Sequence, residues 1–456
     1  MSPRILRRLS SALAVSLLAA CGQDQDQTQP LAPSVNRSAA SVQTDLVRQL
    51  AAGRGIGPMA RPAAVRGSLV RLGQALAFDK ILSGNRDISC MTCHLPAFGT
   101  GDARSLSIGQ GASGLGLNRI HPVGAFIPRN APSLFNLTVL KSLFWDGRVS
   151  VDGAGQFHTP AGSALSPRMA RVFEFGPVSA LGLFPVLSRE EMRAQGGNEL
   201  AAFPDDDMQG IWRGLMRRLG RIPEYRRLFE AAYPGTEFED MSFAHASNAI
   251  GGFLVDQFSF ANAPWDRFLA GDDNALNPDQ LQGAQTFMSI KCSICHNGPA
   301  FSDNKFHNVA VAQFGPGKGN GPGGNDDFGR MNVTGLAAEQ YAFRTTPLRN
   351  VVLTGPFGHD GAISGLRDFI AHYSESDLKL KGFDPNTLEP LLRNTVVPNA
   401  DQILATRDTI IRGVVLPSAT IDQLAAFMTA LTDPAAVDLR RTIPRRVPSG
   451  LPVDRP

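Results

Sequence analysis

The chain has 456 residues, of which 43 % are hydrophobic and 19 % are charged. This balance excludes a disordered protein and a multi-span membrane protein, and the length is enough for two or three packed domains. The formal net charge is +3, but Arg4, Arg7 and Arg8 lie in a segment that we expect to be removed. The mature chain is then neutral overall, which argues against a nucleic-acid-binding protein.

The N-terminus has the pattern of an export signal. An apolar stretch over residues 9–20 follows the three arginines and is far shorter than the ~20 residues that a spanning helix needs. We therefore expect a signal peptide over residues 1–20. The run LAAC that ends at Cys21 resembles a bacterial lipobox, which implies a lipidated Cys21 on a periplasmic protein. Gly22 rather than Asp follows, which favours the outer membrane. The alternative is an ordinary signal peptide cut nearby, with Cys21 incidental.

Both ends of the mature chain have a composition that is typical of flexible segments. Residues 21–60 begin with a stretch rich in Gln, Asp, Pro and Ser and are expected to form a flexible tether. Residues 437–456 contain several prolines and a small basic cluster, and they are expected to form a flexible, solvated tail.

The four remaining cysteines lie in two CxxCH pentads. In such a pentad the two thiols can bond the two vinyl groups of one haem, and the adjacent imidazole can bind its iron. The expected attachment residues are Cys90, Cys93, Cys292 and Cys295, and the expected iron ligands are His94 and His296. A four-thiolate zinc site is the alternative, and the histidine after each pair argues against it. Two covalently bound haem c groups are therefore predicted.

Apolar residues recur at helical spacing ahead of each pentad, as with Leu69, Leu72 and Leu76, while strand-like alternation is scarce. The sequence predicts a mostly α protein with two cytochrome-c-like haem domains and long Gly- and Pro-rich loops. We expect an N-terminal haem domain over residues 61–265 and a C-terminal haem domain over residues 266–436.

Several further motifs resemble those of the bacterial dihaem cytochrome c peroxidase and MauG superfamily. The similarity covers roughly residues 65–435. The motifs are LGQALAFD at residues 72–79, PRNAP at 128–132, FWDGR at 144–148, TPLRN at 346–350 and LTGPFGHDG at 353–361. The resemblance implies an oxidoreductase that reacts with H2O2, with a peroxidatic haem in the N-terminal domain and an electron-transfer haem in the C-terminal domain.

For the second haem, the resemblance points to Tyr373 as the ligand opposite His296. Many family members carry a methionine fourteen residues beyond the position of His359, and MauG-type members carry a tyrosine there. Tyr373 also falls on the apolar face of a short helix predicted from residue 364 onward. A phenolate ligand favours oxidised iron. The alternatives are a packed core tyrosine beside a five-coordinate iron, and ligation by His372.

For the first haem, family peroxidases often carry a capping histidine in a segment that here reads SIGQ and ends at Gln110. This departure implies an open iron, with Gln110 as a hydrogen-bond donor to peroxide. His121 or His158 remain alternative ligands. The family's distal glutamate commonly precedes a methionine, which points to Glu191 as the base that moves the peroxide proton. Glu190 is the alternative base, and two solvated carboxylates at a helix start are the plainer interpretation.

The resemblance also assigns residues between the haems. Trp145 is expected to carry electrons or a shared radical from one haem to the other, its alternative being an ordinary buried indole. Family members hold a calcium ion between the domains, and the matching positions are Asn130, Thr354 and Pro356. His359 lies beside them in the sequence and is expected to tune the path between the haems.

The leading functional hypothesis is an exported dihaem peroxidase that reduces H2O2, with electrons from a small cytochrome c or cupredoxin entering at the second haem. The second hypothesis is a MauG-like enzyme that uses H2O2 to oxidise side chains, tryptophan above all, of a partner protein. The third is a dihaem electron carrier without catalysis. Membrane contact through the lipid anchor alone is expected, and no nucleic acid.

Overall fold

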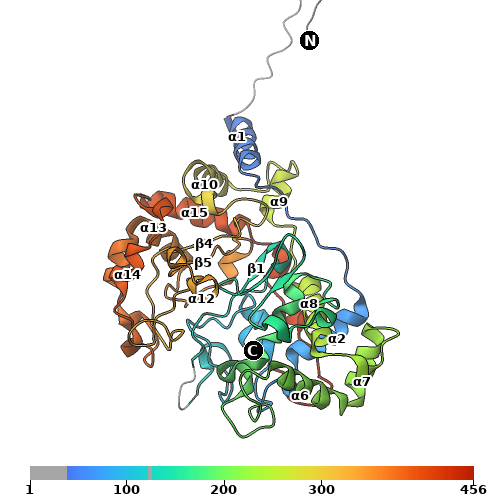
Figure 1. Cartoon of the computed structure of the whole chain (residues 1–456). Helices are drawn as coiled ribbons and strands as arrows, with labels where there is room; N and C mark the ends of the chain where they lie inside the picture. The colour runs from blue at the N-terminus through green and yellow to red at the C-terminus, as the bar shows by residue number, and fades with distance from the viewer. Residues whose placement is uncertain (1–38, 122–125) are drawn as a thin grey trace, which may run out of the picture.

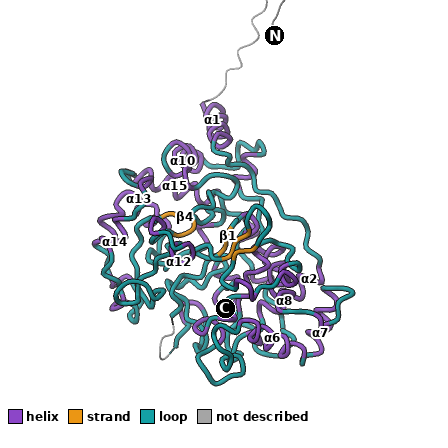
Figure 2. Tube along the Cα trace, viewed as in Figure 1, coloured by secondary structure: helices purple, strands orange, loops and turns teal. Residues whose placement is uncertain are grey.

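The structure is a computed structural model that describes residues 39–121 and 126–456 (Figure 1). The predicted signal peptide and Cys21 lie outside the described residues. Helices predominate, and the few strands are short (Figure 2), which confirms the prediction of a mostly α protein. Within the described part of the chain, no helix combines the length and the apolar character needed to cross a membrane.

The N-terminal half is organised around the helix that precedes the first pentad. Its helices are α2 (Gly67–Phe78), α3 (Cys90–Cys93), α4 (Pro167–Ala170), α5 (Pro177–Ala180), α6 (Met208–Gly220), α7 (Pro223–Ala232) and α8 (Phe243–Phe258). Its strands β1 (Ser142–Leu143), β2 (Val149–Val151) and β3 (Phe157–His158) form an antiparallel sheet in that order. Helix α2 packs against α8 and buries Leu69, Leu72 and Leu76 completely.

The C-terminal half repeats this plan. Its helices are α9 (Pro264–Leu269), α10 (Pro278–Ser289), α11 (Cys292–Cys295), α12 (Met331–Thr334), α13 (Leu366–Lys381), α14 (Ala400–Ala405) and α15 (Ser418–Ala430). Strands β4 (Phe306–His307) and β5 (Phe343–Arg344) pair antiparallel. Helix α10 precedes the second pentad and packs against α15, as α2 packs against α8. Trp265 of α9 belongs to this second core, with Phe287 and Phe427.

A glycine makes the close helix contact in each half. A Cβ atom on Gly73 of α2 would lie 1.9 Å from the carbonyl oxygen of Ala249 in α8. A Cβ atom on Gly283 of α10 would lie 2.0 Å from the carbonyl oxygen of Gln423 in α15. Both distances are impossible for a real side chain, so each helix pair depends on a glycine to approach this closely.

The first described helix packs on the C-terminal half. Helix α1 (Ala39–Gly53) lies beside α10 in Figure 1. Val47 and Ala51, one helical turn apart, are fully buried. The side-chain amide of Gln43 donates to the side-chain oxygens of Gln282 and Gln285 on α10, at 3.1 Å each. The prediction of a flexible tether is therefore wrong for the helical part of residues 21–60.

The end of the chain packs on the N-terminal half (Figure 1). Leu439 and Val447 are buried in the first core. Near the terminus, Asp454 forms an ion pair with Lys80 at 2.6 Å and accepts a hydrogen bond from Thr92, a residue inside the first pentad. The prediction of a flexible tail over residues 437–456 is wrong, because apolar and charged anchors alternate along it. Each end of the described chain thus packs on the half that is remote from it in sequence.

Candidate active site

Two cavities lie at the two pentads, one in each half. The C-terminal cavity has a volume of about 520 Å³, and its wall includes Cys292, Cys295, His296 and Tyr373. The N-terminal cavity has a volume of about 150 Å³, and its wall includes Cys90, Cys93, His94 and Glu191. The structure therefore brings each pair of predicted attachment cysteines to a cavity together with its predicted histidine ligand.

The two pentad histidines are held in the same way. His94 Nδ1 lies 3.0 Å from the carbonyl oxygen of Thr100, and His296 Nδ1 lies 2.9 Å from that of Phe301. Thr100 and Phe301 both have left-handed backbone, with φ of 63° and 56°, a conformation that is costly for such residues. An Nδ1–H bonded to a carbonyl fixes the ring and leaves Nε2 as the metal-binding nitrogen. Burial lowers the pKa of both histidines, which keeps them neutral.

The pentad cysteines are half-buried free thiols. Burial raises the pKa of Cys90 to about 11 and the pKa values of Cys93 and Cys292 to about 12. Such thiols are protonated at neutral pH and are poor zinc ligands until they lose that proton. Two thiols and one oriented imidazole in the wall of each apolar cavity fit a covalently bound haem.

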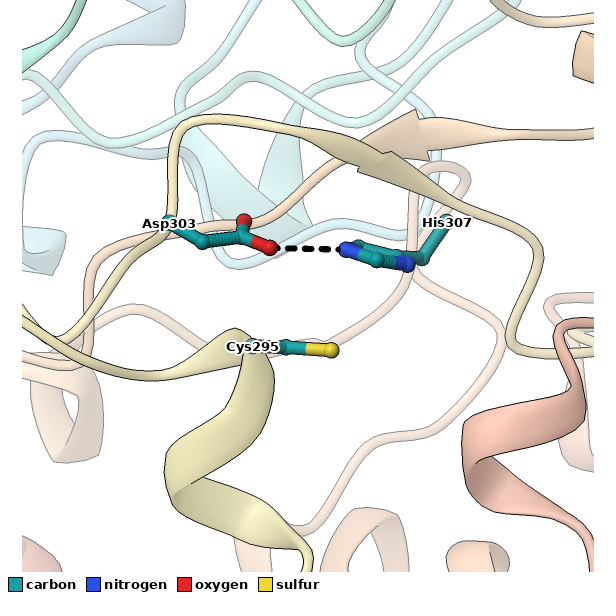
Figure 3. A group of neighbouring side chains, drawn as sticks. All are labelled: Cys295, Asp303 and His307. Carbon is teal, nitrogen blue, oxygen red and sulfur yellow. Dashed lines mark hydrogen bonds and ion pairs between the residues drawn. The ribbon is translucent and has the colours of Figure 1, made fainter. Parts of the chain in front are cut away.

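One group of side chains resembles a metal site without being one. Cys295, Asp303 and His307 have ligand atoms within 4.8 Å of one another (Figure 3). However, His307 Nε2 lies 3.0 Å from Asp303, and His307 Nδ1 lies 2.5 Å from Asp408. Both ring nitrogens are therefore occupied by carboxylates. Burial lowers the pKa of His307, but the contacts with Asp303, Cys295 and Asp408 outweigh it and raise this pKa to about 11, which favours an ion-paired ring over a metal ligand.

Tyr373 lines the C-terminal cavity from helix α13, together with Phe369 and Ile370. Its hydroxyl has no hydrogen-bond partner among the described residues, unlike an ordinary core tyrosine. Burial raises the pKa of this hydroxyl. The neighbouring His372 points elsewhere, because its Nε2 lies 2.8 Å from the carbonyl oxygen of Val309 and the ring is absent from the cavity wall. Of the two predicted alternatives, the structure brings only Tyr373 to the cavity that contains His296.

Glu191 lines the N-terminal cavity from a π-helical turn, Arg189–Arg193. The Ser188 hydroxyl caps this turn by accepting a hydrogen bond from the Glu191 backbone N–H at 3.1 Å. Burial raises the pKa of the Glu191 carboxyl, while the positive charges of Arg148 and Lys318 oppose that rise. Glu190 is exposed. The geometry favours Glu191 over Glu190 as the group that can touch a ligand in this cavity.

Gln110 does not lie where the sequence predicted it. Its side-chain oxygen accepts a hydrogen bond from Asn85 at 2.8 Å, and the residue is absent from the wall of the N-terminal cavity. Its backbone N–H instead donates to the carbonyl oxygens of Glu190 and Glu191, at 3.3 and 3.1 Å. The structure therefore does not support a direct hydrogen bond from Gln110 to peroxide. The Gln110 backbone instead contacts the π-helical turn that carries Glu191.

The two histidines considered as alternative iron ligands also lie away from the wall of the N-terminal cavity. His158 is exposed on β3, where its Nε2 lies 2.9 Å from Asp152. The ring of His121 lies against Gly111, where an added Cβ atom would be 2.7 Å from Nε2. Neither histidine occupies a capping position in this structure.

Trp145 lines both cavities. Its indole Nε1–H donates to the backbone carbonyl of Asn130 at 2.8 Å, which fixes the ring in the wall that the cavities share. Asn130, Pro132, Ser133 and Arg344 complete this shared wall. The structure thus places the tryptophan between the two pentads, as the sequence predicted.

The three expected calcium positions come together on one side of the C-terminal cavity. Asn130, Thr354 and Pro356 all belong to its wall. The side-chain amide of Asn130 donates to the carbonyl oxygen of Arg104 at 2.8 Å, which leaves its oxygen available to a cation. His359 is adjacent, since its carbonyl oxygen accepts the Asn130 backbone N–H at 2.9 Å. Its ring stacks on Phe343, with ring centroids 3.8 Å apart.

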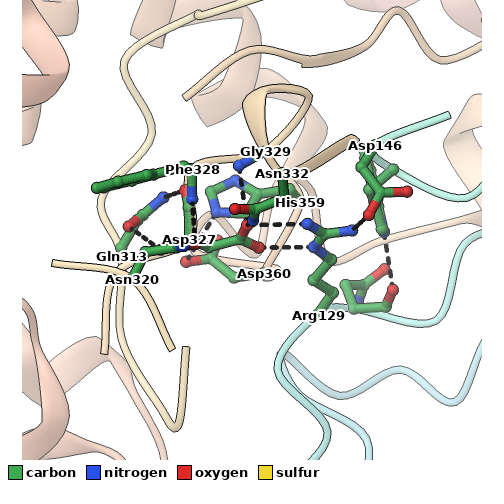
Figure 4. Close-up of polar contacts among 12 residues, drawn as sticks. Arg129, Asp146, Gln313, Asn320, Asp327, Phe328, Gly329, Asn332, His359 and Asp360 are labelled. Carbon is green, nitrogen blue, oxygen red and sulfur yellow. Dashed lines mark hydrogen bonds and ion pairs between the residues drawn. The ribbon is translucent and has the colours of Figure 1, made fainter. Parts of the chain in front are cut away.

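A buried ion-pair network crosses between the halves beside this site (Figure 4). Arg129 donates to both carboxylate oxygens of Asp327, at 2.6 and 2.8 Å, and to Asp146 at 2.6 Å. These contacts hold the pKa of Asp146 and Asp327 below the ordinary range despite burial. Sequence reasoning noted the motifs of Arg129 and Asp146 and missed Asp327, because no local signal pairs residues so far apart.

Comparisons with known proteins agree with this geometry. Residues 67–274 match the family model described as di-haem cytochrome c peroxidase. Cytochrome c551 peroxidase from Pseudomonas aeruginosa is 30 % identical over 322 residues, which cover 70 % of this chain and 75 % of that protein. The methylamine utilization protein MauG from Methylorubrum extorquens is 28 % identical over 306 residues, which cover 67 % of this chain and 68 % of that protein.

Two solved structures share the fold. A MauG-like protein associated with microbial copper homeostasis has a TM-score of 0.58 and 23 % identity, covering 84 % of this chain and 95 % of its own. The diheme peroxidase BthA from Burkholderia thailandensis has a TM-score of 0.57 and 19 % identity, covering 88 % of this chain and 98 % of its own.

Proposed function

Since this chain belongs to the di-haem cytochrome c peroxidase family, we propose that it reduces H2O2 to water with electrons from a small redox protein. As a member of that family it is an oxidoreductase with two c-type haems. The proposal rests on one observation: two cavities with a common wall carry different side chains opposite their pentads. Trp145 touches both cavities, while a carboxylate ends one cavity and a phenol ends the other.

The protein would bind two haems that have different roles in the reaction. Cys90 and Cys93 hold one haem and Cys292 and Cys295 the other, with His94 and His296 as iron ligands. When bound, the haem iron supplies the redox chemistry that breaks the O–O bond and passes single electrons. Electrons enter at the C-terminal site and reach the N-terminal site, where peroxide is consumed.

Glu191 moves the proton in the N-terminal cavity. Its carboxylate would accept a proton from one peroxide oxygen and return it to the other, which would depart as water. Overall, H2O2 takes up two electrons and two protons and gives two water molecules. Arg148 supports this role from the same wall, because its cation lowers the energy of the Glu191 carboxylate. Arg148 is itself fixed by an ion pair to Asp146 at 3.1 Å and by the ring of Phe144.

Tyr373 and Trp145 serve the electron route. Tyr373 and His296 line the same cavity, so Tyr373 would be the second protein ligand of a haem iron held there and would exclude peroxide from it. Such an iron transfers electrons without reacting with H2O2 itself. The Trp145 indole lies in the wall of both cavities and would offer a π system from one site to the other. The position of both side chains in the cavity walls supports these roles.

The proposal is tested by stoichiometry. Purified diferric protein is mixed with a reduced small cytochrome c or cupredoxin, and H2O2 is added in measured amounts. The proposal predicts that two donor molecules are oxidised for each H2O2 consumed, with many turnovers. Donor oxidation that requires no H2O2, or consumption of H2O2 that leaves the donor reduced, would contradict it. A protein that exchanges electrons with the donor and ignores H2O2 would be an electron carrier.

A second function is favoured by Tyr373 specifically. The residue stands where many peroxidases of the family carry methionine and MauG-type members carry tyrosine, and MauG proteins are among the relatives of this chain. In this alternative, H2O2 removes two electrons from a tryptophan side chain of a partner protein and becomes two water molecules. Mass spectrometry of exported proteins encoded beside this chain, incubated with it and H2O2, distinguishes the two. A tryptophan that loses hydrogen or gains oxygen supports modification over donor oxidation.

We further propose that the protein is periplasmic, is anchored through lipidated Cys21, and binds one Ca²⁺ through Asn130 and the carbonyl oxygens of Thr354 and Pro356. The oxygen-rich donor set suits Ca²⁺. Replacement of Cys21 by Ser should release the protein into the soluble periplasmic fraction. Retention of Cys21→Ser in the membrane fraction would contradict the anchor.

A further inference from the structure

Arg344 stands out among the residues of the shared wall. It is the last residue of strand β5 and lines both cavities. Its backbone N–H donates to the carbonyl oxygen of Trp145 at 2.8 Å, and its Nε donates to that of Phe144 at 3.2 Å. The side chain is 5 % exposed. The first contact fixes the Arg344 backbone beside Trp145, and the second orients its guanidinium toward the backbone of the adjacent Phe144.

This guanidinium has no carboxylate partner in the described part of the chain. Its Nη1 is buried without any hydrogen bond. Burial alone lowers the pKa of Arg344 to about 10, and no acidic group opposes that effect. A buried charge without a partner costs several kcal/mol, so folded proteins rarely keep one.

The other buried arginines around the cavities show the contrast. Arg349 lines the C-terminal cavity and pairs with Asp266 at 2.9 Å. Arg129 lines the N-terminal cavity and pairs with Asp146 and Asp327. Both are as well buried as Arg344. The chain therefore supplies carboxylates to its other buried cavity arginines, and Arg344 is left for an anion that enters with a ligand.

The ligand that both cavities fit is haem, which carries two propionate carboxylates. A guanidinium binds carboxylates through paired N–H donors and remains charged when buried. We propose that Arg344 binds propionate groups of both haems and thereby couples the two sites electrostatically. The inference rests on the occupation of both cavities by haem, and it does not depend on which reaction the N-terminal site performs.

The proposal makes a specific claim about redox equilibria. A nearby cation favours the reduced form of an iron, because reduction lowers the positive charge of the centre. Loss of the Arg344 charge should therefore lower the midpoint potential of each haem. A residue that served one site would affect one potential, whereas a residue that contacts both must affect both.

The test is a spectroelectrochemical titration of the full-length holoprotein and three variants. In Arg344→Gln, both midpoint potentials should fall, with a tenfold or greater change in each oxidised-to-reduced ratio, which corresponds to about 59 mV. Arg344→Lys keeps the charge and should restore most of the shift. Arg330→Gln removes a nearby cation that lies outside both cavity walls and should leave both potentials unchanged. Haem content and circular dichroism verify that the compared proteins are loaded and folded.

A second readout remains informative if Arg344→Gln fails to fold. Resonance Raman bands of propionate bending should shift for both haems in Arg344→Lys, because a lysine cannot reproduce the paired N–H contacts of a guanidinium. Unchanged potentials in loaded Arg344→Gln, a shift confined to one haem, or unchanged propionate bands in Arg344→Lys would overturn the proposal. None of these readouts requires peroxide turnover, so their failure is separate from failure of the proposed function.

Discussion

The N-terminal and C-terminal cavities are built alike on the side of the pentad and differ on the opposite side. On the pentad side of each cavity, the helix that precedes the pentad contains a glycine at its close helix contact. The pentad histidine is then held by the carbonyl oxygen of a residue with left-handed backbone. On the opposite side, Glu191 on a π-helical turn lines one cavity and Tyr373 on α13 lines the other. Under the proposed function this difference assigns the two cavities different tasks, because a phenol at the iron would exclude a small ligand and a carboxylate would not.

The largest expected effect comes from the distal residue of the N-terminal cavity. Replacing Glu191 by Gln keeps the shape and removes the proton acceptor, so peroxide turnover should fall by about 10²–10⁴-fold. Glu190→Gln is the matched control, because Glu190 is exposed on the same turn. Steady-state donor oxidation measures both. Equal losses in the two variants would show that the turn, rather than the Glu191 carboxylate, is what matters.

The corresponding change in the C-terminal cavity is Tyr373→Phe. Loss of an anionic oxygen ligand should raise the potential of the C-terminal haem, by at least a tenfold change in its oxidised-to-reduced ratio, or about 59 mV. The N-terminal potential should stay within error. Tyr341→Phe is the control, since Tyr341 lines the same cavity while its hydroxyl is bonded to Asp326 at 3.0 Å. A C-terminal potential that ignores Tyr373→Phe would remove this residue from the iron.

The pH dependence of the reaction with H2O2 should reveal the titration of the Glu191 carboxyl in the N-terminal cavity. Burial raises the pKa of Glu191 above its ordinary value of 4.5. A carboxyl with a raised pKa stays protonated to higher pH, and a protonated carboxyl cannot accept the peroxide proton. The rate of reaction with H2O2 should therefore fall as pH decreases through this raised pKa, with the acid limb above pH 4.5. Stopped-flow rates across pH measure it, and an identical acid limb in Glu191→Gln would contradict the assignment.

Smaller effects, on stability rather than activity, are expected where the two ends of the described chain pack on the opposite halves. Val47→Ala should cost about 2 kcal/mol of unfolding free energy, because Val47 is fully buried between α1 and the C-terminal half. Asp454→Asn should cost about 1 kcal/mol, through the lost pair with Lys80. Denaturant unfolding measures both, with Asp401→Asn on an exposed pair as control. Ends that can be altered without any loss would be loosely attached.

The smallest effect is expected at the histidines that were considered as caps. His158→Ala removes an exposed ring bonded only to Asp152. The spectrum and the peroxide reactivity of the resting protein should both stay as they are. Immediate reactivity gained by His158→Ala would instead mean that His158 reaches the N-terminal iron in solution.

Local sequence signals predicted the repeated side of the site well. The pentads and the preceding helices follow from spacing and periodicity, because each depends on residues close together in the chain. The place of Trp145 was implied by the family resemblance alone. The contacts that were missed are long-range. The partner of Arg129 is Asp327, and the cavity-facing position of Arg344 depends on how β5 lies against Trp145. No periodicity or composition reports such contacts.

Composition was misleading at the two ends of the described chain, and the family motif was incomplete at Gln110. Polar residues dominate the stretch before α1, yet α1 buries Val47 and Ala51 against its neighbour. The tail contains prolines and charges, and its scattered apolar residues still reach the first core. For Gln110, the family motif gave the correct neighbourhood, beside Glu191. The direction of its side chain, toward Asn85, is set by packing that the motif does not contain.

The central claim is that one iron is open to peroxide while Tyr373 closes the other. Low-temperature EPR of the as-isolated diferric protein tests it directly, before and after one equivalent of H2O2 and again in Tyr373→Phe. We expect one high-spin and one low-spin ferric signal, loss of the high-spin signal with H2O2, and loss of the low-spin signal in Tyr373→Phe. Two low-spin signals that do not respond to H2O2 would contradict it.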